Sequence, residues 1–285
     1  MKNIRLSRIV TTARLPRAGM LVLALLAAGQ LVAATSKNPT SKFYVADLAG
    51  HAEVNTGEKI EDLTNSSVFS AEGTVIETKA DSTNAIVLSN GTGIFFESDS
   101  RLEIRRFLQE PFLPNRTDLE TEPSISQTQS HLPRGTIGLC TSKLVAGSVM
   151  TISTPLAEVS VRGQKLVVQS TDDETRVSLI AGDVTVRGEG FSGGEILQPG
   201  QQAVVTRGAP GQPPLVVIRP IPEADLPALE EKVTQACMAR RTVYFDIAER
   251  QNETEDPPEL TPVPVTPVNP DDIGPVISSS ALPGN

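Results

Sequence analysis

The sequence predicts an all-β protein, built either as two facing sheets or as an open solenoid of short strands. Short apolar segments recur about every 8–12 residues between glycine and polar turns, a spacing typical of sandwiches and solenoids rather than of βαβ units. Residues 157–162 read Ala-Glu-Val-Ser-Val-Arg, the strict alternation of a half-buried strand that we expect Gly163 to end. Tryptophan is absent and aromatic residues make up only 4% of the chain, so the core must be mainly aliphatic.

Residues 1–34 are predicted to be a secretory signal peptide that is cleaved after Ala34. A basic leader precedes an apolar run from Met20 to Ala28, and small residues precede the cut, as in signal peptides. The alternative is an uncleaved membrane anchor. However, the segment from Met20 to Ala34 contains Gln30 and falls short of the roughly 20 apolar residues that a spanning helix needs. Cleavage predicts a periplasmic or secreted protein.

The predicted mature chain is strongly acidic. The full chain carries a formal net charge of −9, and residues 1–34 hold five basic and no acidic side chains, so cleavage leaves −14. Such a surface repels phosphate backbones and anionic lipids. We therefore expect no nucleic-acid partner and, because no later apolar run is long enough to span a bilayer, no membrane span after cleavage.

Residues 35–220 are predicted to form one β domain in two blocks, 43–107 and 135–207. Residues 85–88 are apolar throughout, as expected of a strand buried on both faces, and Asn90-Gly91 follows as a strong hairpin signal. Residues 102–105 read Leu-Glu-Ile-Arg and alternate instead. The segment 107–134 contains four prolines and many polar residues, so we expect a long excursion between the blocks, of a length that is usually functional or mobile.

The remainder is predicted to hold a helix with a short strand, residues 221–250, and a disordered tail, residues 251–285. Apolar residues from Leu226 to Ala236 follow helical spacing, and Pro227 suits the first turn. This amphipathic helix could close the β domain or could dock a partner. Residues 252–285 contain eight prolines, six acidic residues and no basic ones, a composition that cannot bury enough apolar surface to fold.

The chain contains two cysteines, Cys140 and Cys237. An exported protein can oxidise them, and two cysteines allow one intrachain bridge. The alternative is a pair of buried thiols that behave as small apolar side chains. The sequence does not supply the geometry that would decide between these alternatives.

A comparison with the sequence motifs of known catalytic, cofactor-binding and metal-binding sites predicts no such residues in this chain. Only two histidines, His51 and His131, are present, and they lie far apart in sequence. Neither a Gly-x-Ser-x-Gly elbow nor a His-Glu-x-x-His motif occurs. The glycine-rich residues 188–194 lack the following helix of a dinucleotide loop. A binding or structural module is therefore favoured over an enzyme.

The second block resembles the FecR domain, the extracytoplasmic module of ferric-dicitrate-type sigma-factor regulators. The matching segments are turns and strands: residues 147–149, 152–163, 177–179, 182–186 and 197–201, with weaker matches at 73–78, Ser82, Ala85 and 90–91. The resemblance implies an all-β domain. The best-known members carry a cytoplasmic anti-sigma segment and a spanning helix, where this chain has the predicted signal peptide. Gln164 also stands where the family usually has threonine. The resemblance thus predicts a stand-alone exported version.

Two functional hypotheses follow. The first is a non-enzymatic protein–protein interaction module with a role in signalling. It would bind an unknown protein of the bacterial envelope through exposed β edges and residues 107–134. The alternative is a structural or polysaccharide-binding cell-surface protein. Sugar platforms usually need exposed aromatic residues, and Tyr44 and Tyr244 are the only tyrosines.

Overall fold

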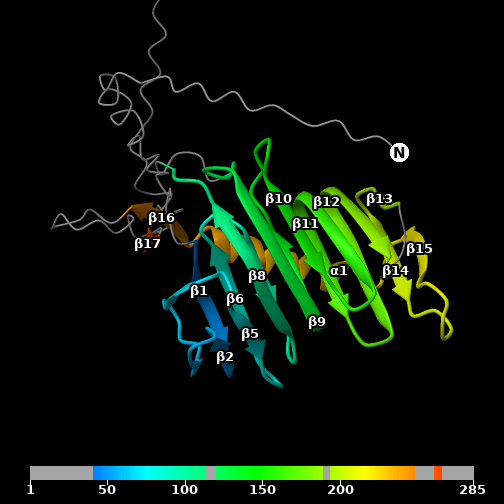
Figure 1. Ribbon diagram of the computed structural model, residues 1–285, viewed down its shortest axis with the longest axis horizontal. Coiled ribbons are helices and arrows are strands. Elements are labelled where there is room, and N and C mark those ends of the chain that lie inside the picture. Colours follow the sequence, from blue (N-terminus) through cyan, green and yellow to red (C-terminus); the bar gives the residue numbers. More distant parts are fainter. Residues whose placement is uncertain (1–40, 113–119, 189–192, 248–259, 265–285) are drawn as a thin grey trace, which may run out of the picture. The chain divides into compact units, whose positions relative to one another are not determined.

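The computed structural model describes residues 41–112, 120–188, 193–247 and 260–264. Within them, fifteen strands form one continuous, unclosed sheet that folds into two facing layers (Figure 1). The predicted all-β class is confirmed. Among the described residues, no helix has the length and apolar character needed to cross a membrane.

Six strands lie in the first layer and six in the second. The first layer contains β1 (Lys42–Ala49), β4 (Val68–Ser70), β6 (Thr83–Leu88), β7 (Gly93–Phe96), β14 (Gln201–Thr206) and β15 (Leu215–Pro220). The second layer contains β2 (Ala52–Asn55), β3 (Ile60–Asp62), β5 (Val75–Thr78), β8 (Arg101–Gln109), β10 (Val149–Ser153) and β13 (Glu195–Leu197).

Three long strands belong to both layers: β9 (Ser126–Cys140), β11 (Ala157–Ser170) and β12 (Glu174–Gly188). The first part of β9 pairs with β8 and its last residues pair with β7. Because the three strands pass from one layer to the other, Ile86 and Leu166 of the first layer and Ile76 and Val159 of the second share one aliphatic core. The Asn90-Gly91 hairpin is present between β6 and β7.

Gly163 does not end the alternating strand. Strand β11 continues to Ser170, and its register against β12 shifts between Val161 and Gln164. Gly163 and Gly182 both have positive φ, 110° and 99°, and a Cβ on Gly182 would overlap the backbone of Gly163. The paired glycines therefore let two neighbouring strands bend together, because such conformations and close approach suit residues without a side chain.

The predicted excursion at 107–134 is too long at both ends. Residues up to Gln109 belong to β8, and residues from Ser126 belong to β9, which pairs with β8 on one side. On its other side β9 pairs in parallel with β10, so the two predicted blocks form one sheet. The prediction placed Pro133 in a loop because proline is rare inside strands. In the structure, Pro133 lies within β9 at the point where the register against β8 shifts and the hydrogen-bond ladder is interrupted.

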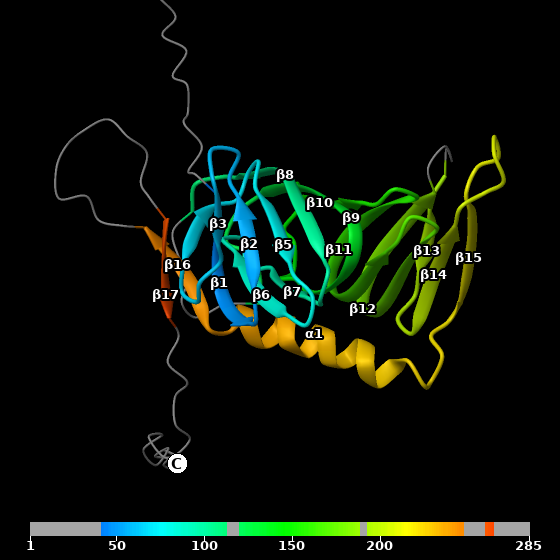
Figure 2. The same cartoon turned by 90° about the horizontal axis from the view of Figure 1, so that it is seen from below.

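Helix α1 (Leu226–Arg240) lies along the outer face of the first layer (Figure 2). Leu229 and Val233 pack on Val167 of β11. The sheet carries glycine at two places where the helix approaches closely: a Cβ on Gly93 would overlap the carbonyl oxygen of Ala236, and a Cβ on Gly138 would lie 2.6 Å from that of Lys232. The helix was predicted at 227–241, and it closes the β domain as the first of the two alternatives proposed.

A separate two-stranded sheet pairs β16 (Val243–Ile247) with β17 (Leu260–Pro264). Val243 and Phe245 pack with Tyr44, Val87 and Ala239 in a small apolar cluster. Strand β17 falls inside the segment predicted to be disordered, so the prediction is wrong for these five residues: pairing with β16 supplies backbone hydrogen bonds that composition cannot foresee. The rest of the predicted tail, from residue 265, and the predicted signal peptide lie outside the described residues.

Candidate interaction surfaces

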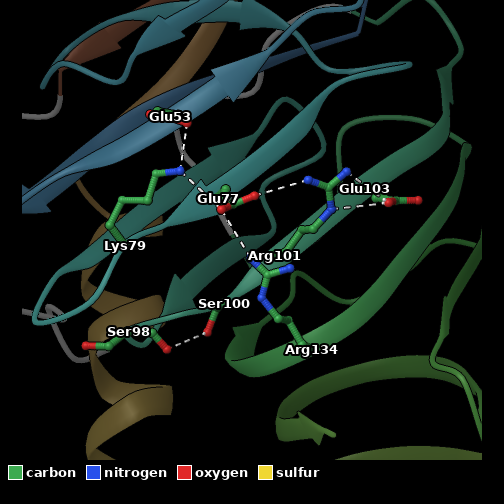
Figure 3. A network of polar contacts seen from close by, with 8 residues as sticks. All are labelled: Glu53, Glu77, Lys79, Ser98, Ser100, Arg101, Glu103 and Arg134. Atoms are coloured by element: carbon green, nitrogen blue, oxygen red, sulfur yellow. Dashed lines mark hydrogen bonds and ion pairs between the residues drawn. The ribbon is translucent and has the colours of Figure 1, made fainter. Parts of the chain in front are cut away.

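The outer face of the second layer carries a row of charged side chains, one from each of five neighbouring strands. Figure 3 shows Glu53, Glu77, Arg101 and Arg134 of this row. Glu53 of β2 pairs in register with Asp62 of β3 and with Glu77 of β5. Glu77 pairs with Arg101 of β8, which pairs with Arg134 of β9. The row therefore runs from three carboxylates at one end to two guanidinium groups at the other.

Glu77 lies at the centre of this row. Its carboxylate contacts Arg101 at 3.1 Å, Arg134 at 3.1 Å and Lys79 at 3.1 Å. Lys79 also reaches Glu53 at 2.7 Å. Partial burial opposes ionisation of Glu77, but the hydrogen bonds and positive charges of Lys79 and Arg101, with Arg134, outweigh it and lower its pKa. The carboxylate thus remains charged in the folded protein.

His131 and Ser153 lie side by side on the same layer, with the ring Nδ1 2.9 Å from Ser153 Oγ. The hydroxyl of Ser153 also reaches the carbonyl oxygen of Ser130 at 3.2 Å, to which it can donate. Burial and the charge of Arg105 lower the pKa of His131, and Glu103 opposite it is already paired with Arg101 and Arg105.

The structure joins Cys140, at the end of β9, to Cys237 of α1 by a disulfide that closes a separation of 97 residues. Arg240, on the next turn of the helix, has only 8% of its side chain exposed. It donates hydrogen bonds to Thr141 O at 3.2 Å and to Ser142 Oγ at 2.8 Å. The end of the helix is therefore fixed both covalently and through the turn that follows β9.

Glu122 connects the segment before β9 to the segment before β10. It is 3% exposed and accepts hydrogen bonds from Val145 N–H and Ser126 Oγ–H, both at 2.8 Å. Burial raises its pKa, and the hydrogen bonds from Ser148, Val145 and Ser126 offset this only in part. Glu122 therefore ties the described residues just before β9 to the segment before β10.

Strand β15 forms one edge of the first layer and, among the described residues, pairs only with β14. Val216 and Ile218 pack against the core. Leu215 and Val217 point the other way and are 61% and 44% exposed. Val204, opposite Val217 on β14, continues this apolar strip. A short apolar edge of this kind is suited to accept a partner strand.

Comparison with known families identifies the β domain, since residues 74–185 match the family described as FecR protein. These residues are a FecR domain. The match runs from the start of β5 into the second half of β12 and confirms the resemblance inferred from the sequence. No curated protein matches the chain.

Two crystal structures of a provisionally assigned anti-sigma factor from Parabacteroides distasonis ATCC 8503 are similar to the chain. They align with 54% of its length at 16% and 15% identity, with TM-scores of 0.40 and 0.39. The aligned parts cover 62% and 63% of those chains, so this chain spans less than two thirds of their length.

The FecR domain contains Cys140 but not Cys237, because α1 lies beyond the matched residues. Its strand from Ala157 has the predicted alternation: Val159 and Val161 are buried, and Glu158 and Arg162 are exposed. Arg162 lines a shallow concave surface with Lys143 and Ser148.

The sequence does not predict the charged row of the second layer. Its members are residues 53, 62, 77, 101 and 134, and only strand register brings them together.

Proposed function

We propose that this chain is an exported, non-enzymatic FecR-domain protein that binds another protein of the bacterial envelope and acts in signalling. The observation that carries the proposal is the open edge of β15, with Leu215 and Val217 exposed beside it. An added strand would gain main-chain hydrogen bonds from the edge and side-chain contacts from the apolar strip.

Export is supported by the leader expected at residues 1–34. Mass spectrometry of the protein recovered from an outer-membrane bacterium that expresses the full chain tests it. A mature chain that begins at Thr35 is expected, and a protein that retains Met1 would contradict export by cleavage.

The polysaccharide-binding alternative receives no support from Tyr44. Tyr44 is only 8% exposed, and its hydroxyl donates to Ser66 Oγ at 3.1 Å. Tyr44 therefore belongs to the apolar cluster beneath β16 and cannot serve as an exposed platform for a sugar ring.

Affinity capture from envelope extract tests the proposed edge. We expect the double variant Leu215→Lys/Val217→Lys to lose the main captured protein, because two charges cannot be buried against an added strand without a large cost. Ile60→Lys is the matched control: Ile60 is an equally exposed apolar residue, but on β3 in the other layer.

Equal capture by the wild type and the β15 variant would contradict this surface. The identity of the captured protein tests the signalling role. A receptor of the outer membrane or a regulator of the inner membrane would support it, and capture only of cell-wall structural proteins would contradict it.

A further inference from the structure

We propose that the β2–β3 hairpin holds a zinc-type divalent cation between His51, Glu53 and Asp62. One ligand atom from each of these three side chains lies within 4.8 Å of the others. The set combines an imidazole nitrogen with two carboxylate oxygens, which is the donor mixture of three-ligand zinc sites that keep a fourth position for water. This site is separate from the β15 edge and does not depend on the proposed partner.

The backbone holds the three residues together before any cation arrives. Glu53 and Asp62 are direct cross-strand partners, so their side chains emerge next to each other on one face of the hairpin. His51 lies two residues before Glu53 and shares that face, and its carbonyl oxygen accepts a hydrogen bond from Lys79 N–H at 3.0 Å. Its ring Nε2 already lies 2.8 Å from Asp62 Oδ1. A bound cation would take the place of the ring proton between these two atoms.

Lys79 is the cation with which a bound metal ion would compete. Asp62, Glu53 and Glu77 stand side by side across three strands, and Lys79 reaches both Glu53 and Glu77. Arg101 and Arg134 bind Glu77 at its far side. At the hairpin end, Asp62 has the histidine as its partner. A metal ion bound by His51, Glu53 and Asp62 would therefore take Glu53 from Lys79 and leave Glu77 with its two arginines.

Ligand chemistry selects the class of cation. Calcium prefers six to eight oxygen ligands and magnesium an octahedral oxygen shell, whereas imidazole suits zinc and its first-row neighbours. The side chains of His51 and Asp62 are 53% and 71% exposed. They can therefore rotate to the spacing of about 3.4 Å that a tetrahedral zinc ion sets between its ligand atoms, and the cation can enter from solvent.

Zinc titration of the mature, tag-free chain, followed by NMR of the histidine rings, tests the site. The chain has only two histidines, so His131 is an internal control. We expect stoichiometric zinc to shift the ring signals of His51 and to leave those of His131 unchanged. Calcium at the same concentration should move neither ring.

Calorimetry on variants assigns the ligands. We expect the dissociation constant for zinc to rise at least tenfold in His51→Asn and in Asp62→Asn, and to change less than twofold in Glu58→Gln, an exposed glutamate of the same hairpin. Lys79→Met should lower the dissociation constant, because it removes the cation that competes for Glu53. All four changes lie on the surface, and thermal unfolding without zinc verifies that each variant is folded.

Three results would overturn the proposal. These are unmoved His51 signals at millimolar free zinc, equal shifts of both histidines, and zinc affinity unchanged in His51→Asn or Asp62→Asn. None of them bears on capture through β15, so the site and the proposed function can fail separately.

Discussion

The outer face of the first layer carries Val167, Phe95 and Ala85 beneath or beside helix α1, whereas the outer face of the second layer carries Glu77, Arg101 and Glu103 in an ion-pair network. The first face is apolar and needs a cover, which the disulfide and Arg240 hold in place. On the second face, the charged side chains pair with one another and remain accessible to solvent, so no covering helix is required.

This difference shows how one core can serve two unlike surfaces. The inner side chains of both layers form one buried core that is mainly aliphatic, with Phe43, Phe96 and Phe107. Only the outward-facing alternate positions differ, so the surface chemistry of each layer can change without repacking the core. The cover of the first face, helix α1, lies beyond the residues that match the FecR family.

The largest expected effect comes from the covered face. The double variant Cys140→Ala/Cys237→Ala should lose about 4 kcal/mol of unfolding free energy, because the bridge closes a loop of nearly one hundred residues in the unfolded chain. Urea denaturation measures this loss, and reductant should bring the wild type to the same midpoint. The variant itself should not respond to reductant. Equal midpoints for oxidised wild type and variant would show that the bridge does not hold the helix.

The second effect tests the close approach of helix and sheet. Gly138→Ala should cost about 1–3 kcal/mol, since the new methyl group meets the backbone of Lys232 and the helix must move. Gly193→Ala is the control, because a Cβ there meets nothing within 4 Å. If both variants unfold at the same urea concentration, the helix does not rest on the sheet at Gly138.

On the outer face of the second layer, Glu77→Gln should lower the unfolding free energy by only about 1 kcal/mol at pH 7, as expected of partly exposed ion pairs. The native pKa of Glu77 is lowered, so its contribution is present above the unfolded value of 4.5 and is lost as the pH falls through the native value. The difference in unfolding free energy between the wild type and the variant should therefore become smaller in acid. A difference in unfolding free energy that widens in acid would contradict the assignment.

The smallest effect is expected at Glu158 and Arg187, a cross-strand pair with about half of each side chain exposed and 3.6 Å between charged atoms. Glu158→Gln should change the unfolding free energy by less than about 0.5 kcal/mol. Urea denaturation at low and high salt measures it. If Glu158→Gln lowers the unfolding free energy as much as Glu77→Gln does, then isolated ion pairs stabilise the outer face of the second layer as much as the network does.

Several of these features could be predicted from the sequence. The unbroken apolar run at 85–88 predicted a strand buried on both faces, and it lies between the core and the apolar cluster of α1 and β16. The alternation at 102–105 predicted a strand with one exposed polar face, and Glu103 is in the ion-pair network. Gly163 was misread because a glycine that bends a strand and one that ends it look alike in sequence.

The sequence by itself determined the all-β class, the alternation at 102–105 and 157–162, the presence of a helix and the resemblance to the FecR family, because these depend on neighbours a few residues apart. The tertiary structure decided which distant residues meet: Cys140 with Cys237, and Asp62, Glu53, Glu77, Arg101 and Arg134 in one row. The physical reason is strand register. A slip of one residue in any pairing would turn those side chains to the opposite face, and only the packed core fixes the register.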